Sequence, residues 1–340
     1  ANKECHRLIR KAKERSPNGY IVITGCYAQL KPESISKIPG VDMIVGAGQK
    51  FNIHKLINNI ENKDDVKIHG CEIHDLDYSS SFSLNERTRS FLKIQDGCDY
   101  VCTYCTIPLA RGKGRCDTIQ NIISNAKKIS KNNIKEIVIT GVNIGTFIDP
   151  DTGEKFYDLI KELEKVKGIE RYRISSIEPN LITDEIIDFI KESSKFMPHF
   201  HIPLQSGSDK ILRRMKRRYN SKIYKQKIEK IIQHIPDVCI GADVIVGFPD
   251  ETEEDFHETL NFIKDLNISY LHVFSYSERE NTEAINHNNK INRKTIKERS
   301  QTLRILSNKL KNLHYERYIG SIQTALFEQE NKDGYIFGFT

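Results

Sequence analysis

The chain has 340 residues, of which 38% are hydrophobic and 29% charged, a composition that excludes a disordered or membrane-embedded protein. It contains no apolar run near the roughly 18–20 residues needed to cross a bilayer and no secretory signal at its start, so we expect a cytoplasmic protein. The net charge of +6 is modest, and eight cysteines without a secretory signal argue against a disulfide framework.

The first 60 residues are predicted to form part of a small α/β domain. After an opening helix, strand and helix patterns alternate at residues 20–24, 32–38, 41–47 and 50–60. Because the sequence opens inside a helix and lacks an initiator Met, we expect this domain to be truncated at its amino end. Residues 61–89 turn polar and include a serine run, a composition that predicts a linker.

Between residues 90 and 318, strand and helix patterns repeat in a regular order. Strand-like runs occupy residues 91–95, 136–140, 171–176, 199–204, 240–246 and 270–276, and helix-length stretches lie at 118–132, 156–166, 183–194, 221–235 and 252–266. Because each parallel strand must return through a crossover helix, six such units predict an α/β fold with an open, partial (β/α)6 barrel. Such sheets carry their functional groups on the loops after the strands.

Small and polar residues follow the predicted strands. The second strand ends at Thr140, Gly141 and Asn143, the third at Ser176 and Glu178, and the fourth at Gln205, Ser206 and Gly207. Since the carboxyl ends of parallel strands meet at one edge, these residues are expected on one rim of the barrel.

Three cysteines follow the first predicted strand of the barrel. Cys98, Cys102 and Cys105 have the spacing C-x3-C-x2-C, and thiolates at this spacing can hold one soft metal centre. Three ligands are one fewer than most structural sites use, which leaves a coordination position for a substrate. A structural zinc site, for which Cys116 is the nearest further thiol, and a plain electron-transfer cluster are the alternatives.

This loop, with Tyr104 just before its last cysteine, resembles the radical S-adenosylmethionine (SAM) superfamily. The resemblance implies that the three cysteines hold a [4Fe–4S] cluster whose open iron binds SAM for reductive cleavage. It also implies that SAM lies against Tyr104 and the rim residues Thr140, Gly141, Asn143, Ser176, Glu178, Gln205, Ser206 and Gly207.

Residues 23–29, with the sequence ITGCYAQ, resemble an N-terminal motif of the methylthiotransferases within that superfamily. The resemblance implies that Cys26 is a ligand of a second, auxiliary [4Fe–4S] cluster that carries the sulfur for insertion. The other two ligands are expected upstream of this chain, because Cys5 lies inside the opening helix. A tRNA substrate, a reducing electron donor and a sulfur source are the implied partners, and no membrane is.

Three branches of that family act on isopentenyladenosine in tRNA, on threonylcarbamoyladenosine in tRNA, and on an aspartate of a ribosomal protein. Residues 93–115, 139–145, 175–179 and 201–219 resemble the threonylcarbamoyladenosine branch, and the last two segments are the most telling. The expected reaction is methylthio insertion at C2 of N6-threonylcarbamoyladenosine at position 37. The two sister reactions remain alternatives.

Two basic segments predict contact with RNA. Residues 213–230 carry nine Lys or Arg against one acid, and residues 290–317 carry nine against two. A solvated helix face is the competing interpretation. Residues 319–340, with a strand expected at 322–328, resemble the start of a TRAM β-barrel that holds RNA, and the expected phosphate ligands are Arg213, Arg214, Arg217 and Arg218.

A non-enzymatic alternative is an RNA-binding module stabilised by a metal. It predicts bound zinc rather than iron. The remaining cysteines, Cys71 and Cys239, are interpreted as structural thiols, and His199 and His201 as packing or hydrogen-bonding residues within a strand.

Overall fold

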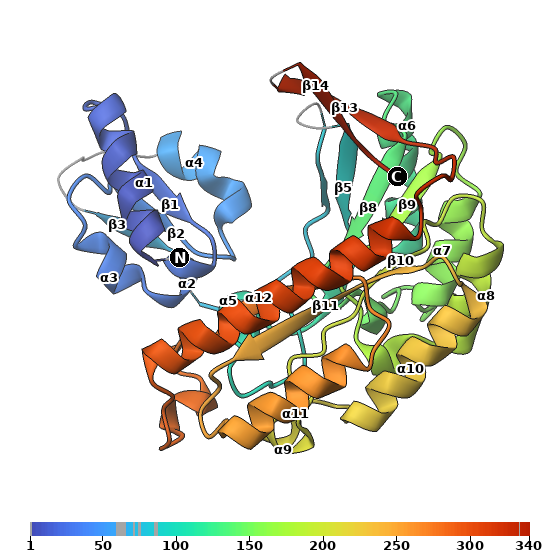
Figure 1. Ribbon diagram of the computed structural model, residues 1–340. Helices are drawn as coiled ribbons and strands as arrows, with labels where there is room; N and C mark the ends of the chain where they lie inside the picture. Colours follow the sequence, from blue (N-terminus) through green and yellow to red (C-terminus); the bar gives the residue numbers. More distant parts are fainter. Residues whose placement is uncertain (1, 59–65, 71, 74–75, 85–87, 333) are drawn as a thin grey trace. The chain divides into compact units, whose positions relative to one another are not determined.

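The computed structural model describes residues 2–58, 66–70, 72–73, 76–84, 88–332 and 334–340 (Figure 1). The chain forms two compact units. The first contains residues 1–78, 97–100 and 106–115, and the second contains residues 79–96, 101–105 and 116–340. The cysteine loop is therefore divided, with Cys98 in the first unit and Cys102 and Cys105 in the second.

The first unit is a three-stranded parallel sheet with short helices. Its elements are α1 (Asn2–Arg15), β1 (Val22–Thr24), α2 (Cys26–Leu30), α3 (Pro32–Ser36), β2 (Met43–Val45), η1 (Lys50–Asn52), α4 (Ile53–Asn58), β3 (Lys67–His69) and α5 (Ile107–Arg111). The strand order is β1-β2-β3, and Ile23 pairs with Ile44. Ile9, Ala28 and Ile35 are buried in its small core, which confirms the βα pattern predicted for this part of the chain.

The predicted linker at 61–89 is wrong in two places. Residues Lys67–His69 form β3, which pairs in parallel with β2, and Ser81–Phe82 form β4, which pairs antiparallel to β5. Polar composition concealed both strands, because edge strands this short need few apolar residues. Residues 61–65, 71, 74, 75 and 85–87, and with them Cys71, lie outside the described residues.

The second unit contains the six predicted parallel strands, which are β5 (Arg89–Lys93), β8 (Glu136–Thr140), β9 (Arg171–Ile174), β10 (His199–His201), β11 (Cys239–Val246) and β12 (Tyr270–Ser275). Strands β5, β8 and β9 form one run and β10, β11 and β12 another. Parallel bridges from Tyr172 to Phe196 and from Ser176 to His201 connect the two runs. The order β5-β8-β9-β10-β11-β12 confirms the partial barrel. Short strands β6 (Gln95–Asp96) and β7 (Arg115–Cys116) were not predicted.

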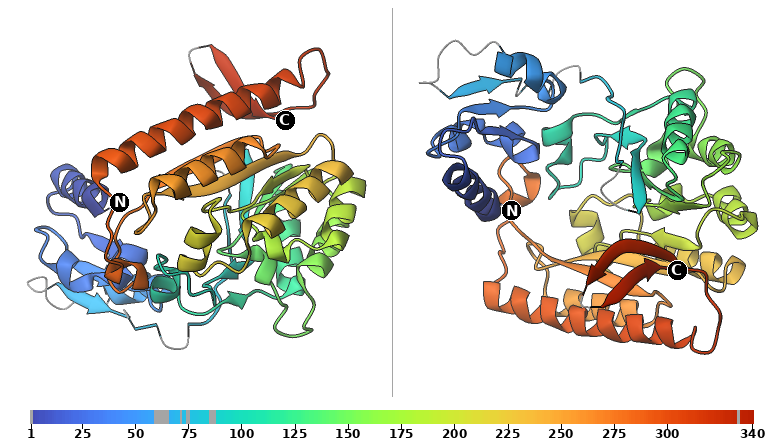
Figure 2. Two further views of the ribbon diagram at one scale, coloured as in Figure 1. Left: turned by 60° about the horizontal axis from the view of Figure 1, so that its bottom comes forward. Right: turned by 90° about the horizontal axis from the view of Figure 1, so that it is seen from above.

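Helices cover the outer face of this curved sheet (Figure 2). They are α6 (Ile119–Lys131), α7 (Phe156–Glu164), α8 (Asp184–Glu192), α9 (Asp209–Arg214), α10 (Ser221–His234), α11 (Glu253–Lys264) and α12 (Arg293–Glu316), with 3-10 turns η2 (Ile144–Thr146), η3 (Pro179–Leu181) and η4 (Glu283–Asn286). Local caps begin several of them: Thr118 accepts a hydrogen bond from Asn121 N at 3.1 Å, and Thr252 forms a capping box with Asp255.

Alternation along the strands divides the side chains between two faces. In β5, Ser90 and Leu92 are fully buried, whereas Arg89, Phe91 and Lys93 are partly exposed. The buried positions join the core that packs against the helices. The other positions face the inside of the sheet, where they line a cavity described below.

The chain ends in a hairpin. Helix α12 lies along β12, and β13 (Leu326–Lys332) then pairs antiparallel to β14 (Tyr335–Phe339). The first of these strands begins four residues later than predicted, and its assignment to a TRAM domain stays a prediction. None of the helices in the described part of the chain is both long and apolar enough to cross a bilayer.

Candidate functional site

In the second unit, the loop that carries Cys102 and Cys105 is held by backbone contacts. Thr103 N donates to Met215 O at 3.3 Å, and Thr103 Oγ1 donates to Arg214 O at 2.9 Å. Ala284 N donates to Thr103 O at 2.8 Å. These bonds fix the loop against the end of α9 and the start of η4, so the position of the two thiols depends on segments distant in sequence.

Arg217 is the central charge of this site. Its Nη1 lies 3.0 Å from Cys102 Sγ and 3.4 Å from the Tyr104 hydroxyl, and its Nε lies 3.2 Å from the Tyr219 hydroxyl. Its Nη2 forms an ion pair with Glu178. The Arg217 side chain is only 4% exposed. Its prediction as an RNA phosphate ligand is therefore wrong, because its donors point into the protein.

Burial and the Arg217 charge have opposite effects on the pKa values of Cys102 and Glu178. Burial raises the pKa of the Cys102 thiol above its usual value, and the guanidinium opposes that shift. Burial likewise raises the pKa of Glu178, again against the effect of Arg217. A fixed cation beside a thiol favours the thiolate, the form that binds metals.

The rim after the strands contains buried polar atoms that the described residues leave without partners. These atoms are Asn143 Oδ1 and Nδ2, Ser175 Oγ, Glu178 Oε2 and Gln205 Oε1. Their backbone is nevertheless held in place, since Asn143 N donates to Gln95 Oε1 at 3.0 Å. Buried polar groups normally have hydrogen-bond partners, so this rim has the donors and acceptors for a polar cofactor.

Three other predicted rim residues, Ser206, Gly207 and Thr140, form hydrogen bonds within the protein. Ser206 Oγ lies 3.1 Å from Thr259 Oγ1, and Gly207 N donates to the same hydroxyl at 3.0 Å. A Cβ on Gly207 would lie 2.8 Å from Thr259 Cα. Ser206 and Gly207 thus fasten the rim loop to α11, and their assignment as cofactor ligands stays a prediction. Thr140 ends β8, and its carbonyl accepts from Ile94 N at 2.9 Å.

Two further rim residues lie close to neighbouring side chains. A Cβ on Gly141 would lie 2.8 Å from Ile144 Cγ2 and 3.0 Å from Gln95 Oε1, so this turn needs a residue without a side chain. Ser176 lines a cavity inside the sheet.

That cavity, of about 570 Å³, contains residues that sequence reasoning did not single out as a group. His201 Nε2 lies 2.9 Å and His272 Nδ1 lies 3.4 Å from Asp243 Oδ1. The ligating atoms of the three residues all lie within 4.8 Å of one another. Asp243 of β11 pairs in register with His272 of β12, whereas His201 of β10 pairs with Gly241, two residues before Asp243, and no linear spacing indicates that arrangement.

In the first unit, the backbone around Cys98 requires glycine. Cys98 N donates to Gly112 O at 3.1 Å, and Cys98 Sγ accepts a hydrogen bond from Tyr100 N at 3.3 Å. Gly97 has a φ of 72°, and a Cβ there would lie 1.9 Å from Lys113 O.

Cys26 is the first residue of α2, which packs against α5, and Arg111 Nε lies 3.5 Å from its Sγ. Cys98 and Cys26 therefore each have a hydrogen-bond donor directed at the sulfur, Tyr100 N and Arg111 Nε respectively.

The donor set fits an iron–sulfur cluster. Among the described cysteines none forms a disulfide bond, so Cys98, Cys102 and Cys105 are present as thiols. Soft sulfur ligands favour iron–sulfur clusters or zinc, and the unpartnered polar atoms of the rim accord with a second, organic ligand beside the metal.

The chain is similar to known proteins of one family. The profile described as the Radical SAM superfamily matches residues 92–263. The threonylcarbamoyladenosine tRNA methylthiotransferase MtaB of Bacillus subtilis is 36% identical over 354 residues, covering 100% of this chain and 77% of that protein. The chain belongs to the radical SAM tRNA methylthiotransferases. This methylthiotransferase is therefore a transferase whose cofactors include an iron–sulfur cluster and SAM.

Two further relatives represent two branches of the family. The MtaB protein of Aquifex aeolicus is 37% identical to this methylthiotransferase over 334 residues, covering 97% of this chain and 81% of the relative. The tRNA-2-methylthio-N(6)-dimethylallyladenosine synthase of Thermodesulfovibrio yellowstonii is 31% identical over 334 residues, covering 98% and 76% respectively.

Proposed function

We propose that this methylthiotransferase inserts a methylthio group at C2 of N6-threonylcarbamoyladenosine at position 37 of tRNA. The observation that carries the proposal is that the MtaB relatives are 36–37% identical over 97–100% of this chain. Dimethylallyladenosine synthases are 31–32% identical at such coverage and reach 36% over only 87% of the chain. Since tRNA is a cytoplasmic substrate, we place the enzyme in the cytoplasm.

Cys98, Cys102 and Cys105 hold the catalytic cluster, which when bound supplies the electron for reductive cleavage of SAM. Arg217 keeps a positive charge beside the Cys102 sulfur and orients Glu178. Tyr104 packs edge-on against Phe248 at a centroid separation of 6.4 Å. Its aromatic surface shields the loop from water.

The rim of the second unit binds SAM. The unpartnered atoms of Asn143, Glu178 and Gln205 supply both donors and acceptors for its polar groups. Ser176, Thr140 and Gly141 complete the same edge. Gln205 has a φ of 65°, an unusual conformation for a residue with a side chain, which marks a locally constrained turn at this position.

Cys26 is a ligand of an auxiliary [4Fe–4S] cluster that it shares with cysteines outside this sequence. It is the first residue of α2, and Arg111 Nε lies 3.5 Å from its sulfur. The sulfur for insertion and the reducing electrons come from external donors.

Exposed arginines outside the site contact the tRNA backbone. Arg213, Arg214 and Arg218 are exposed, and the exposed basic residues at the start of α12, Arg293, Lys294 and Lys297, are further candidates for phosphate contacts. Arg214 also pairs with Asp250, so its charge is partly offset.

The test is an anaerobic assay of the iron–sulfur-reconstituted enzyme on tRNA that carries threonylcarbamoyladenosine, on tRNA that carries dimethylallyladenosine, and on the ribosomal-protein substrate. Mass spectrometry of the products should find the methylthio group only on the first. The variant Cys102→Ala should lose reductive SAM cleavage, whereas Cys5→Ala, in helix α1, should retain it. Modification of another substrate in preference, or bound zinc without SAM cleavage, would refute the proposal.

A further inference from the structure

The inside of the curved sheet carries a cluster of arginines at the amino-terminal ends of β5, β8 and β9, opposite the rim. Glu136 is fully buried between three arginines, with Arg173 Nε at 2.9 Å, Arg89 Nη1 at 3.6 Å and Arg171 Nη1 at 4.0 Å. The three guanidinium groups are only 12–16% exposed. Glu136 is one carboxylate against three cations, and with Glu328 of the hairpin, which also acts on Arg89, two acids still face three cations, so positive charge remains in excess.

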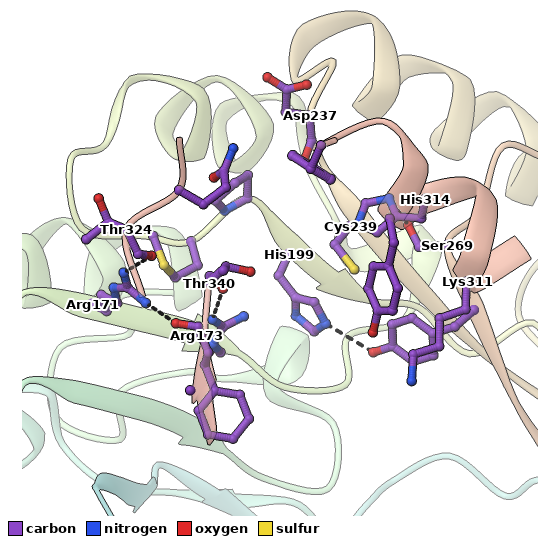
Figure 3. A pocket seen from close by; sticks show the side chains of 18 of the residues that line it. Arg171, Arg173, His199, Asp237, Cys239, Ser269, Lys311, His314, Thr324 and Thr340 are labelled. Atoms are coloured by element: carbon purple, nitrogen blue, oxygen red, sulfur yellow. Dashed lines mark hydrogen bonds between the residues drawn. The ribbon is translucent and has the colours of Figure 1, made fainter. Parts of the chain in front are cut away.

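The carboxyl-terminal hairpin offsets this charge only in part, through Glu328 of β13, whose carboxylate acts on Arg89. Arg171 donates to the backbone oxygens of Phe339 and Thr324 at 2.8 and 2.7 Å, and Arg173 donates to a backbone oxygen of Thr340 at 2.7 Å (Figure 3). The two acceptors of Arg171 are uncharged, so they satisfy its hydrogen bonds without offsetting its charge.

Arg89 is the least satisfied of the three arginines. Within the described part of the chain its Nε is buried without a hydrogen-bond partner, and its guanidinium lies 3.5 Å from the centre of the Phe339 ring. Burial lowers the pKa of Arg89 and the neighbouring Arg173 lowers it further, whereas the charges of Glu136 and Glu328 oppose this shift. An unpaired buried donor on an excess cation is a binding group for an anion.

Arg89 and Arg173 line the cavity of about 570 Å³ that reaches Ser175 and Ser176 at the rim. This volume is within the range of small-ligand pockets. Its acidic group, Asp243, is already contacted by His201 and His272. Ser175 Oγ and His199 Nδ1 are two further buried polar atoms of the lining that the described residues leave without partners. The cavity therefore suits a small ligand with a negative charge and several polar atoms.

His272 is the accessible member of the Asp243 group. Its side chain is 53% exposed, against 13% for His201. Because its Nδ1 faces Asp243, its Nε2 is the ring nitrogen directed toward a ligand, where it can accept or donate a hydrogen bond. Polar groups of the ligand next to its negative charge can therefore form a hydrogen bond with His272 on β12.

We infer that this cavity binds the threonylcarbamoyl substituent of the target adenosine, with its carboxylate at Arg89 and Arg173 and its remaining polar atoms near Ser175 and His272. The inference rests on the proposed function. Threonine joined through its nitrogen retains a free carboxylate and hydroxyl, which match this lining. A dimethylallyl group has neither, and it would leave the buried donors unpaired, so the cavity also selects between the two tRNA substrates.

The test uses anticodon stem-loop RNA with position 37 as threonylcarbamoyladenosine, as its carboxylate methyl ester, or as unmodified adenosine. Affinity is measured by fluorescence anisotropy with the wild-type chain. A charge-assisted hydrogen bond predicts roughly tenfold to hundredfold weaker binding of the ester than of the free acid. Because this comparison needs no variant, loss of folding cannot explain its result.

The variant Arg89→Gln should reduce the preference for the acid over the ester to nearly one, with affinity for unmodified RNA retained. Its SAM cleavage without RNA reports the intact rim. Equal affinity of the wild-type chain for acid and ester would overturn the inference. If the wild-type enzyme modifies threonylcarbamoyladenosine nonetheless, the proposed function stands without this inference. If it modifies only dimethylallyladenosine, the proposed function itself fails.

Discussion

Replacing Arg217 by methionine removes a buried cation while filling most of its space. The Arg217 and Glu178 side chains are 4% and 11% exposed, so the variant leaves a buried carboxylate without its counter-ion. Breaking a buried ion pair on one side costs about 3–5 kcal/mol. The hydrogen bonds to Cys102 and Tyr219 are lost as well. We expect the free energy of unfolding of the reduced, cluster-free chain to fall by about 3–5 kcal/mol.

The same reasoning predicts how the loss depends on pH and on the partner. Burial raises the pKa of Glu178 and Arg217 opposes that shift, so without the arginine the carboxyl group takes up a proton more readily. The penalty should therefore shrink as the pH is lowered. Adding Glu178→Gln removes the unpaired charge, and the double variant should recover about 1–3 kcal/mol relative to Arg217→Met alone.

The assay is urea unfolding followed by circular dichroism under anaerobic, reducing conditions, with the four proteins of the double-mutant cycle. The control is Arg213→Met, because Arg213 is an exposed arginine on the preceding helix and should change stability by less than about 0.5 kcal/mol. A loss below about 1 kcal/mol for Arg217→Met, or no recovery in the double variant, would show that the pair does not support the fold.

Three other changes probe separate features. Burial, with the nearby Arg173 charge, lowers the pKa of His199 to about 4 from 6.5, so the unfolded chain binds more protons than the native one between these pH values. Protonation of His199 should lower the free energy of unfolding by up to about 3 kcal/mol as the pH drops from 7 to 4. In urea titrations, His199→Phe should remove this contribution to the pH dependence of stability. Gly97→Ala places a Cβ 1.9 Å from a backbone oxygen at a φ of 72°, and iron analysis after reconstitution should show loss of the catalytic cluster. Gly207→Ala should lower the free energy of unfolding by about 1–3 kcal/mol through overpacking against α11, while SAM affinity measured by calorimetry is retained. A selective loss of SAM binding would instead favour its assignment as a cofactor ligand.

Local patterns in the sequence were sufficient for the elements of the barrel. Residues 118–132 were expected to be helical and α6 spans Ile119–Lys131; residues 136–140 were expected to be a strand and β8 spans Glu136–Thr140. The reason is that apolar periodicity and capping residues act within a few positions of one another. Short elements escaped prediction, as α5 and α9 did, because a single turn carries too little periodicity.

The features of the site were likewise predictable where they are local in the sequence and not where they depend on distant residues. The spacing of Cys98, Cys102 and Cys105 is a local property that indicated one soft metal centre. The resemblance to radical SAM enzymes implied that this centre is an iron–sulfur cluster, in agreement with the family. The role of Arg217 is not local, because Glu178 lies 39 residues away and Cys102 lies 115 residues away. A run of five basic residues within 213–218 reads as one surface patch until the turn after α9 directs one of them inward.

By itself, then, the sequence determined the family, the order of the six main strands and the helices between them, and the thiols proposed to bind metal, since each of these depends on neighbours in the chain. Only the tertiary structure decided which buried polar atoms of the rim lack partners among the described residues, which residues fasten the rim to α11, and that three arginines surround one glutamate inside the sheet. The physical reason is the parallel sheet: its register brings residues of separate strands together, and the composition of any one strand does not reveal its partners.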